Sequence, residues 1–147
     1  MKRYILYVST QFPKWHSRAG EYTGFLNAIE DKDKIHTCRG NLHYWQNRAK
    51  QINAGNAYLS VCIWTGQPYR SSPKEIFKFY NLGIEELRVI GSNVYVNNLP
   101  INATQFAYND GLNTSDFFAW MQHELEPTSP AAIIHFTPFR YVPANLS

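Results

Sequence analysis

The chain has 147 residues and a net charge of +3. Hydrophobic residues make up 44% and aromatic residues 16% of the chain, which excludes a disordered protein and predicts one folded domain over residues 1–147. The mildly basic balance permits contact with nucleic acid without requiring it.

In chain order, the first half predicts a strand over 4–8, a loop over 11–20, an amphipathic helix over 21–33, a strand over 34–39 and a strand over 57–64. The helix follows from apolar side chains at helical spacing, and the strands follow from β-branched and aromatic runs. The run 57–64 is nearly continuously apolar, so we expect it to be a central strand. Residues 44–52 are ambiguous, although Tyr44, Arg48 and Ile52 would share a helical face.

The second half predicts strands over 75–80, 84–90 and 94–96, the last of them ahead of Leu99-Pro100-Ile101. It then predicts a helical turn over 104–108, a helix over 117–121, a closing strand over 131–136 and a tail over 138–147. The segment 113–116, Asn-Thr-Ser-Asp, supplies the N-cap chemistry of that helix. Pro127 and Pro130 end it. Short strands mixed with a few helices predict a small α+β domain on a mixed sheet or barrel.

The sequence carries no sign of export or membrane insertion. The stretch 1–9 begins with basic residues, but its apolar part is too short for a signal peptide. No run approaches the roughly 20 apolar residues of a membrane span. Cys38 and Cys62 do not form a C-x-x-C pair, so we expect neither a disulfide framework nor a zinc site. We expect a cytoplasmic protein with no membrane partner, and the oligomeric state is left open.

The segment Lys34-Ile35-His36-Thr37-Cys38-Arg39 holds the most informative chemistry, because it places an amine, a hydroxyl and a guanidinium close together. In an extended segment Thr37 and Arg39 share one face, and Lys34 reaches them from the bend where the helix ends. A hydroxyl beside an amine is one way to activate a weak nucleophile. A cationic cluster is equally a way to hold a phosphate. Both uses remain open at this point.

The order of a helix, the run Lys34-x-x-Thr37-x-Arg39 and a central strand resembles the ASCH family. The segment 107–112, Ala-Tyr-Asn-Asp-Gly-Leu, which precedes an acidic-capped aromatic helix, extends the resemblance over residues 22–136. The family has a PUA-like fold, so the resemblance implies a mixed β-barrel with flanking helices. Some members are amidohydrolases that remove the acetyl group from acetylcytidine, and others are thought to bind RNA.

In those enzymes a lysine, a threonine and a downstream glutamate act together. The resemblance places the lysine on Lys34, the threonine on Thr37 and the acid on Asp110, which we take as the catalytic set. Asp110 is one methylene shorter than the family's glutamate. Glu85 and Glu86 are the alternative acids.

Each of these residues also has a structural interpretation. Lys34 could be a solvated lysine beside the charged residues 31–33, and Thr37 could be an ordinary strand threonine. The run Asn109-Asp110-Gly111 is a strong turn signal by itself.

The expected ligand-binding residues are Arg39, Trp64, Tyr69 and Arg70. Arg39 could grip a phosphate or a base edge, or form a rim ion pair. Tyr69 and Arg70 lie in the aromatic insert 65–71, which is similar to that of uncharacterised bacterial and prophage-like relatives. They could form a lid that stacks a base, or a plain exposed loop. We expect Trp64 to be pocket wall or core rather than a nucleic-acid platform.

His36 and His43 flank the motif, but their spacing is poor for a metal, so no metal is expected. No Gly-rich phosphate loop, His-Glu-x-x-His helix or nucleophile elbow is present, and no cofactor is expected. The expected function is recognition of a nucleoside, nucleotide or RNA. Hydrolysis of an acyl-amide on a modified nucleoside is the sharper hypothesis. A non-catalytic RNA-binding module and a protein-interaction domain with a vestigial cleft are the alternatives.

Overall fold

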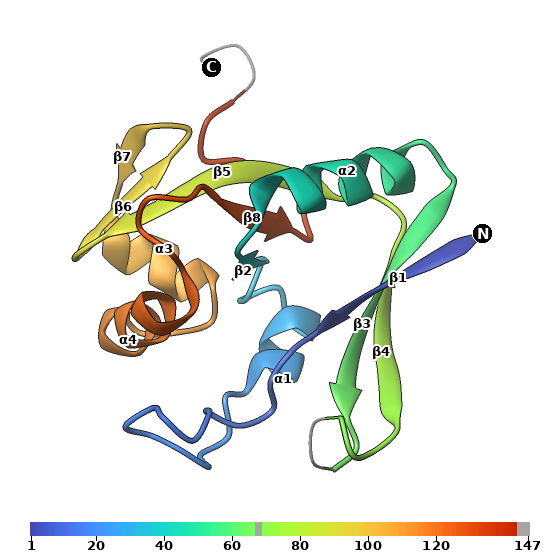
Figure 1. The fold of residues 1–147 in the computed structure, drawn as a ribbon, viewed down its shortest axis with the longest axis horizontal. Coiled ribbons are helices and arrows are strands. Elements are labelled where there is room, and N and C mark those ends of the chain that lie inside the picture. Colours follow the sequence, from blue (N-terminus) through green and yellow to red (C-terminus); the bar gives the residue numbers. More distant parts are fainter. Residues whose placement is uncertain (67–68, 144–147) are drawn as a thin grey trace.

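The computed structural model describes residues 1–66 and 69–143, so positions 67–68 of the insert and 144–147 of the predicted tail lie outside the description. The described chain is an α+β fold with two separate β-sheets and four helices, as Figure 1 shows. None of the helices in the described ranges is long and apolar enough to cross a membrane. The predicted fold class is confirmed at this level.

The smaller sheet has the order β1-β3-β4, with strands β1 (Lys2–Tyr7), β3 (Ala57–Trp64) and β4 (Pro73–Phe79). β3 is central, as predicted, and it pairs with β1 in parallel and with β4 antiparallel. Because strand side chains alternate faces, Leu59 and Val61 point into the protein while Tyr58 and Trp64 lie on the other face. The nearly continuous apolar run therefore belongs to a strand with two different faces.

The larger sheet is antiparallel and has the order β2-β8-β5-β6-β7. Its strands are β2 (His36–Arg39), β5 (Gly83–Ile90), β6 (Asn93–Val96), β7 (Leu99–Ile101) and β8 (Ala131–His135). In the described residues neither sheet closes on itself, since β1 and β4 flank one sheet and β2 and β7 flank the other. The barrel implied by the family resemblance is therefore not confirmed.

The helices are α1 (Phe25–Glu30), α2 (Leu42–Asn53), α3 (Ala103–Asn109) and α4 (Thr114–Glu124). α1 is shorter than the predicted helix 21–33, because Gly24 before it and Lys32 after it have positive φ angles. The ambiguous residues 44–52 are helical within α2, which begins where the Asn41 side chain accepts a hydrogen bond from the Tyr44 amide at 3.1 Å. The predicted cap of α4 is confirmed: Asn113 accepts from the Asp116 amide at 2.8 Å.

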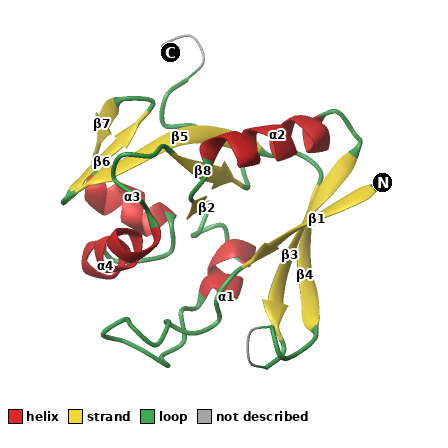
Figure 2. Ribbon diagram, viewed as in Figure 1, coloured by secondary structure: helices red, strands yellow, loops and turns green. Residues whose placement is uncertain are grey.

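Strand β8 separates two apolar cores. Its alternate residues Ala132 and Ile134 face α2 and the smaller sheet, whereas Ala131 and Ile133 face α3 and α4. All five residues of β8 are buried, which explains why its sequence is apolar up to its final histidine. Figure 2 shows α2 on one side of the larger sheet and the α3–α4 pair on the other.

The predicted tail is anchored at its start. Glu85 on β5 accepts hydrogen bonds from the backbone amides of Tyr141 at 2.8 Å and Val142 at 3.0 Å, and from the His135 ring at 2.8 Å. Val142 is buried in the core between the larger sheet and α4. The predicted tail is therefore packed against the domain at residues 141–142, because the buried Glu85 carboxylate holds their backbone in place.

We expect Glu85→Ala to lower the free energy of unfolding by about 2–4 kcal/mol, since it leaves buried donors of three residues without their acceptor. Glu86→Ala is the matched control, because that side chain makes an ion pair with Arg88 that is partly exposed to solvent. It should cost less than about 1 kcal/mol. Urea unfolding of both variants measures the difference, and equal losses would contradict this role of Glu85.

Candidate functional site

A cavity of about 340 Å³ lies between the residues that follow β1, strand β2, α1 and α4. Its volume is in the range of small-molecule sites, roughly 300–1,000 Å³. Its walls are mixed, and the apolar and aromatic part of the lining includes Val8, Phe25, Leu112, Trp120 and Met121. Its charged and hydroxyl lining residues are Lys34, Thr37, Arg39, Asp110, Ser9 and Glu124.

Lys34 is buried at this cavity, with 2% of its surface exposed. Its Nζ donates to the backbone oxygen of Asp110 at 2.6 Å and lies 3.4 Å from the carboxylate oxygen Oδ1 of the same residue. The ammonium group also lies 4.4 Å from the centre of the Phe25 ring. The solvated-lysine interpretation is therefore wrong. Burial lowers the pKa of Lys34, and the Asp110 charge offsets only part of that effect.

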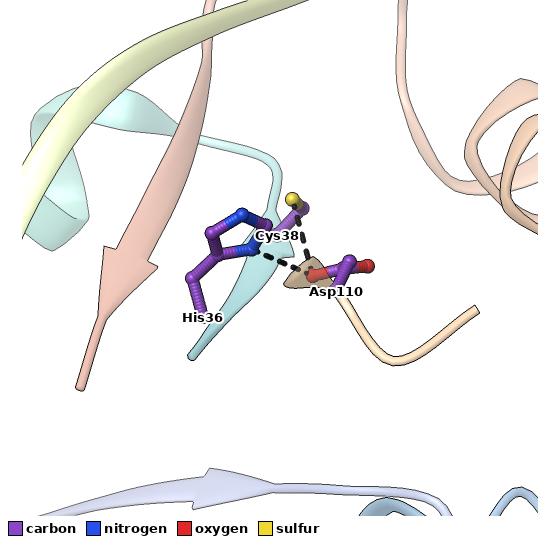
Figure 3. Close-up of side chains that lie close together, drawn as sticks. All are labelled: His36, Cys38 and Asp110. Atoms are coloured by element: carbon purple, nitrogen blue, oxygen red, sulfur yellow. Dashed lines mark hydrogen bonds and ion pairs between the residues drawn. The ribbon is translucent and has the colours of Figure 1, made fainter. Parts of the chain in front are cut away.

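Asp110 follows the last residue of α3 and is buried. Its Oδ1 faces the Lys34 ammonium, the His36 ring nitrogen Nδ1 at 3.0 Å and the Cys38 thiol at 3.6 Å. Figure 3 shows His36 and Cys38 pointing from β2 toward this carboxylate. Burial by itself raises the pKa of Asp110, but the Lys34 charge and the His36 hydrogen bond outweigh it and lower the pKa below its ordinary value. Asp110 is thus an ionised acceptor.

The hydrogen bonds continue from Asp110 away from the cavity. His36 donates from Nδ1 to the carboxylate, so its Nε2 accepts from the Tyr141 hydroxyl at 2.6 Å. The Tyr141 oxygen in turn accepts from the Asn109 side chain at 2.9 Å. Burial lowers the pKa of His36, which keeps the ring neutral in this chain. The anchored C-terminal segment therefore supports the floor of the cavity.

Thr37 and Arg39 share one face, as predicted, and they are bonded to each other. Arg39 donates to the Thr37 hydroxyl oxygen at 2.8 Å and to the backbone oxygens of Cys38 and Tyr7. Arg39 is thus held by the backbone rather than by a rim ion pair. No hydrogen bond joins Lys34 to Thr37 in the described ranges, because the amine is directed to Asp110. The arrangement brings the three motif residues together without forming a base–nucleophile pair.

Of the other predicted ligand residues, one lines the mouth of the cavity and two do not. Tyr69 lines the cavity with 87% of its surface exposed, whereas Trp64 and Arg70 are not among the lining residues. Trp64 instead stacks on Tyr7 with 4.4 Å between ring centres, and it belongs to neither apolar core, so our expectation for it as pocket wall or core is wrong. Its ring lies 5.1 Å from that of Tyr69.

The alternative acids do not reach the cavity. Glu85 holds the C-terminal segment and Glu86 pairs with Arg88, so Asp110 is the acid beside the lysine. Sequence reasoning missed Glu124, which lines the cavity one helical turn after Trp120. That spacing was a usable signal. No sequence signal pointed to Tyr141, because it lies far from the motif in sequence.

His36, Cys38 and Asp110 present ligand atoms within 4.8 Å of one another, which is close enough to suggest a metal site. Two observations argue against it. The shared Asp110 oxygen also faces the Lys34 ammonium at 3.4 Å, which would repel a cation. Burial and the neighbouring carboxylate raise the pKa of the Cys38 thiol well above its ordinary value, whereas metals bind the thiolate. We therefore interpret the cluster as a hydrogen-bond network.

Comparisons of the chain with protein-family models, curated proteins and solved structures found no match. The resemblance to the ASCH family therefore rests on the motifs and the residues described above.

Gly111 lies against Lys34 in a left-handed backbone conformation, with φ of +85°. An added Cβ would stand 3.1 Å from the Lys34 side chain and 3.2 Å from the Phe25 ring. Gly20 is a matched control, since its φ is +84° and an added Cβ would meet nothing within 4 Å. We expect Gly20→Ala to cost about 1 kcal/mol and Gly111→Ala to cost about 1 kcal/mol more. Chemical denaturation measures both, and equal losses would refute the close packing at Gly111.

We also expect the free energy of unfolding to fall as the pH drops below about 6.5. This pH lies well above the range in which carboxylates titrate, so histidines are the groups responsible. Burial lowers the pKa values of His36 and His135, so the unfolded chain binds more protons than the folded chain in this range. The stability from the neutral rings is therefore present above the unfolded pKa and lost below it.

Melting temperatures between about pH 7.5 and about pH 5.5 measure this dependence. His36→Asn, which keeps a donor toward Asp110, should make the dependence shallower. His43→Gln on the exposed face of α2 should leave it unchanged. The same pH dependence in all three proteins would contradict the assignment.

Proposed function

We propose that the cavity binds a nucleoside or nucleotide, either free or as part of an RNA chain. The observation that carries the proposal is the meeting of the buried Lys34 ammonium and the half-buried Arg39 guanidinium with the buried Asp110 carboxylate, at a cavity whose lining also includes apolar and aromatic side chains. Burying charged groups is costly, and residues held in this way in a cavity are typical of binding sites.

The chemistry of the lining suits such a ligand. Arg39 is a planar donor suited to a phosphate or a base edge. Asp110 and Glu124 are acceptors for the amino groups of a base or the hydroxyls of a sugar. Phe25 and Trp120 provide apolar surface for a flat ring. A simple inorganic anion would use the cations but would leave the apolar and aromatic part of the lining without a partner.

Two sequence motifs that lie far apart in the chain also support this proposal. The run Lys34-x-x-Thr37-x-Arg39 and the segment 107–112 meet at one cavity, although 70 or more positions separate Asp110 from the first motif. We propose on this basis that the chain is an ASCH-type domain related to PUA-like folds. Its two open sheets differ from the closed barrel that the family implies.

Hydrolysis of an acyl-amide on a modified nucleoside is the second candidate, and the lowered pKa of Lys34 favours it. In this reaction neutral Lys34 would take the Thr37 proton, and the Thr37 oxygen would attack the amide carbon. The amine would leave with that proton, and water would then release the acyl group from Thr37. The reaction requires the Lys34 amine to turn from Asp110 to Thr37, which is why we place binding first.

The first test measures the binding of acetylcytidine and cytidine monophosphate by calorimetry or by intrinsic tryptophan fluorescence, to which Trp120 in the cavity lining contributes. We expect Lys34→Met to weaken binding by about tenfold or more, because it removes the buried charge while it preserves the length of the side chain. Lys14→Met is the matched control, since Lys14 is exposed in the loop before α1. If the wild-type protein binds neither compound, the proposal is wrong.

The same samples distinguish binding from hydrolysis, because deacetylation changes the absorption spectrum of the base. An enzyme that uses the Thr37 hydroxyl should keep partial turnover in Thr37→Ser and lose it in Thr37→Val. A binding protein should tolerate both substitutions nearly equally and show no turnover. Turnover that survives in Thr37→Val would rule out Thr37 as the nucleophile.

A further inference from the structure

The smaller sheet has one face that the two apolar cores do not use. Side-chain alternation places Arg3, Ile5 and Tyr7 of β1 on this face, next to Tyr58, Ser60, Cys62 and Trp64 of β3 and to Glu75 and Lys78 of β4. None of these residues belongs to either core, although Ser60 and Cys62 in the middle of the face are themselves buried. We call this surface the outer face. In Figure 2 the helices lie to the left of this sheet and above it, which leaves its right-hand side open.

Aromatic rings occupy both ends of the outer face. At one end Tyr58 lies 5.8 Å from Tyr80, measured between ring centres, and Tyr80 is 54% exposed. At the other end Tyr7 and Trp64 are stacked at 4.4 Å. Ile5 is exposed on the strand between them. Tyr80 is exposed and the other three rings are half-buried, so each keeps some surface that can stack with planar rings.

Two cations stand among these rings. Arg3 reaches across to Cys62, with 3.4 Å between its guanidinium and the thiol sulfur, and the Lys78 ammonium lies 5.7 Å from the centre of the Tyr58 ring. Glu75 is the single acid on the outer face in the described ranges. The outer face therefore carries a net positive charge, in a chain whose total charge is also positive. This charge complements a polyanion.

The outer face continues to the cavity. The ring of Trp64 lies 5.1 Å from that of Tyr69, and Tyr69 lines the mouth of the cavity. On the same side Arg39 inside the cavity is bonded to the backbone of Tyr7. A chain molecule that lies along the sheet would thus pass the entrance of the cavity.

We propose that the outer face binds single-stranded nucleic acid, with unpaired bases stacked on its aromatic rings and phosphates against Arg3 and Lys78. Unpaired bases expose the flat surfaces that stack on aromatic side chains, whereas the bases of a duplex are already stacked on one another. The interaction goes beyond the cavity, because Arg3, Lys78, Tyr58 and Tyr80 do not line it. It holds whether or not the cavity takes a nucleoside.

The test is a fluorescence anisotropy titration with a labelled single-stranded RNA of about 12 nucleotides, and with the same RNA as a duplex. Tyr80→Ala should weaken binding by about fivefold or more, since it removes one stacking ring. Tyr108→Ala is the matched control, because Tyr108 is 58% exposed on α3, away from the sheet. Tyr80 follows the last residue of β4, so its removal spares the strand pairing.

A second pair of variants tests the binding of phosphates. The double variant Arg3→Gln with Lys78→Gln should weaken binding, and its logarithmic dependence on salt should become shallower by about 0.7 for each phosphate that the variant no longer neutralises. Lys14→Gln with Lys50→Gln removes the same charge from exposed positions elsewhere and should change neither quantity. The double variant Arg3→Gln with Lys78→Gln should bind free cytidine monophosphate within about threefold of the wild-type affinity, because neither residue lines the cavity; this separates the outer face from the cavity.

Three results would overturn the proposal. The first is equal binding of the single strand and the duplex. The second is a loss of affinity in the control variants as large as the loss in the outer-face variants. The third is self-association through the same surface, seen as a dimer in light scattering that Ile5→Lys converts to a monomer. Failure of the cavity to bind nucleosides would leave the proposal standing, because the outer-face variants are scored on RNA alone.

Discussion

The burial of the Asp110 carboxylate organises this protein. Only 3% of the Asp110 surface is exposed, and three groups from the segment 34–38 compensate for its charge: the Lys34 ammonium, the His36 ring and the Cys38 thiol. A buried ion that loses one such partner is strongly destabilised, so these residues depend on one another. The carboxylate thereby ties the end of α3 to the start of β2, two segments that are distant in the sequence.

The same network connects the cavity to the end of the described chain. His36 accepts a hydrogen bond from the Tyr141 hydroxyl, and Glu85 on strand β5 accepts one from the Tyr141 backbone amide. These hydrogen bonds keep the floor of the cavity in one arrangement. A floor that is already ordered before a ligand arrives loses little entropy when the ligand binds.

The direction of the Lys34 amine decides how the cavity is best interpreted. The amine donates to Asp110, while the Thr37 hydroxyl oxygen accepts from Arg39, so the residues that would catalyse a reaction are each engaged elsewhere. This geometry favours recognition over covalent chemistry. Tyr69, exposed at the cavity mouth and close to Trp64, places the outer face of the smaller sheet next to the same entrance.

Local pattern determined much of this protein. The strands, the capped helix α4 and the grouping of Thr37 and Arg39 on one face follow from side-chain periodicity and from capping chemistry, which act within a few residues. The length of α1 was missed, because the positive φ angles of Gly24 and Lys32 leave no trace in apolar spacing. The choice of Asp110 over Glu85 came from the family resemblance, and only the contacts of each carboxylate separated the two.

Tertiary structure alone decided the rest. The two open sheets depend on which strands pair, and Tyr141 meets His36 across 105 positions of sequence. The burial of Lys34 depends on packing against Phe25 and the turn at Gly111. Periodicity specifies which side of an element is apolar, but it does not specify which other element covers that side. Long-range pairing therefore fixed the cavity, its buried charges and the open outer face.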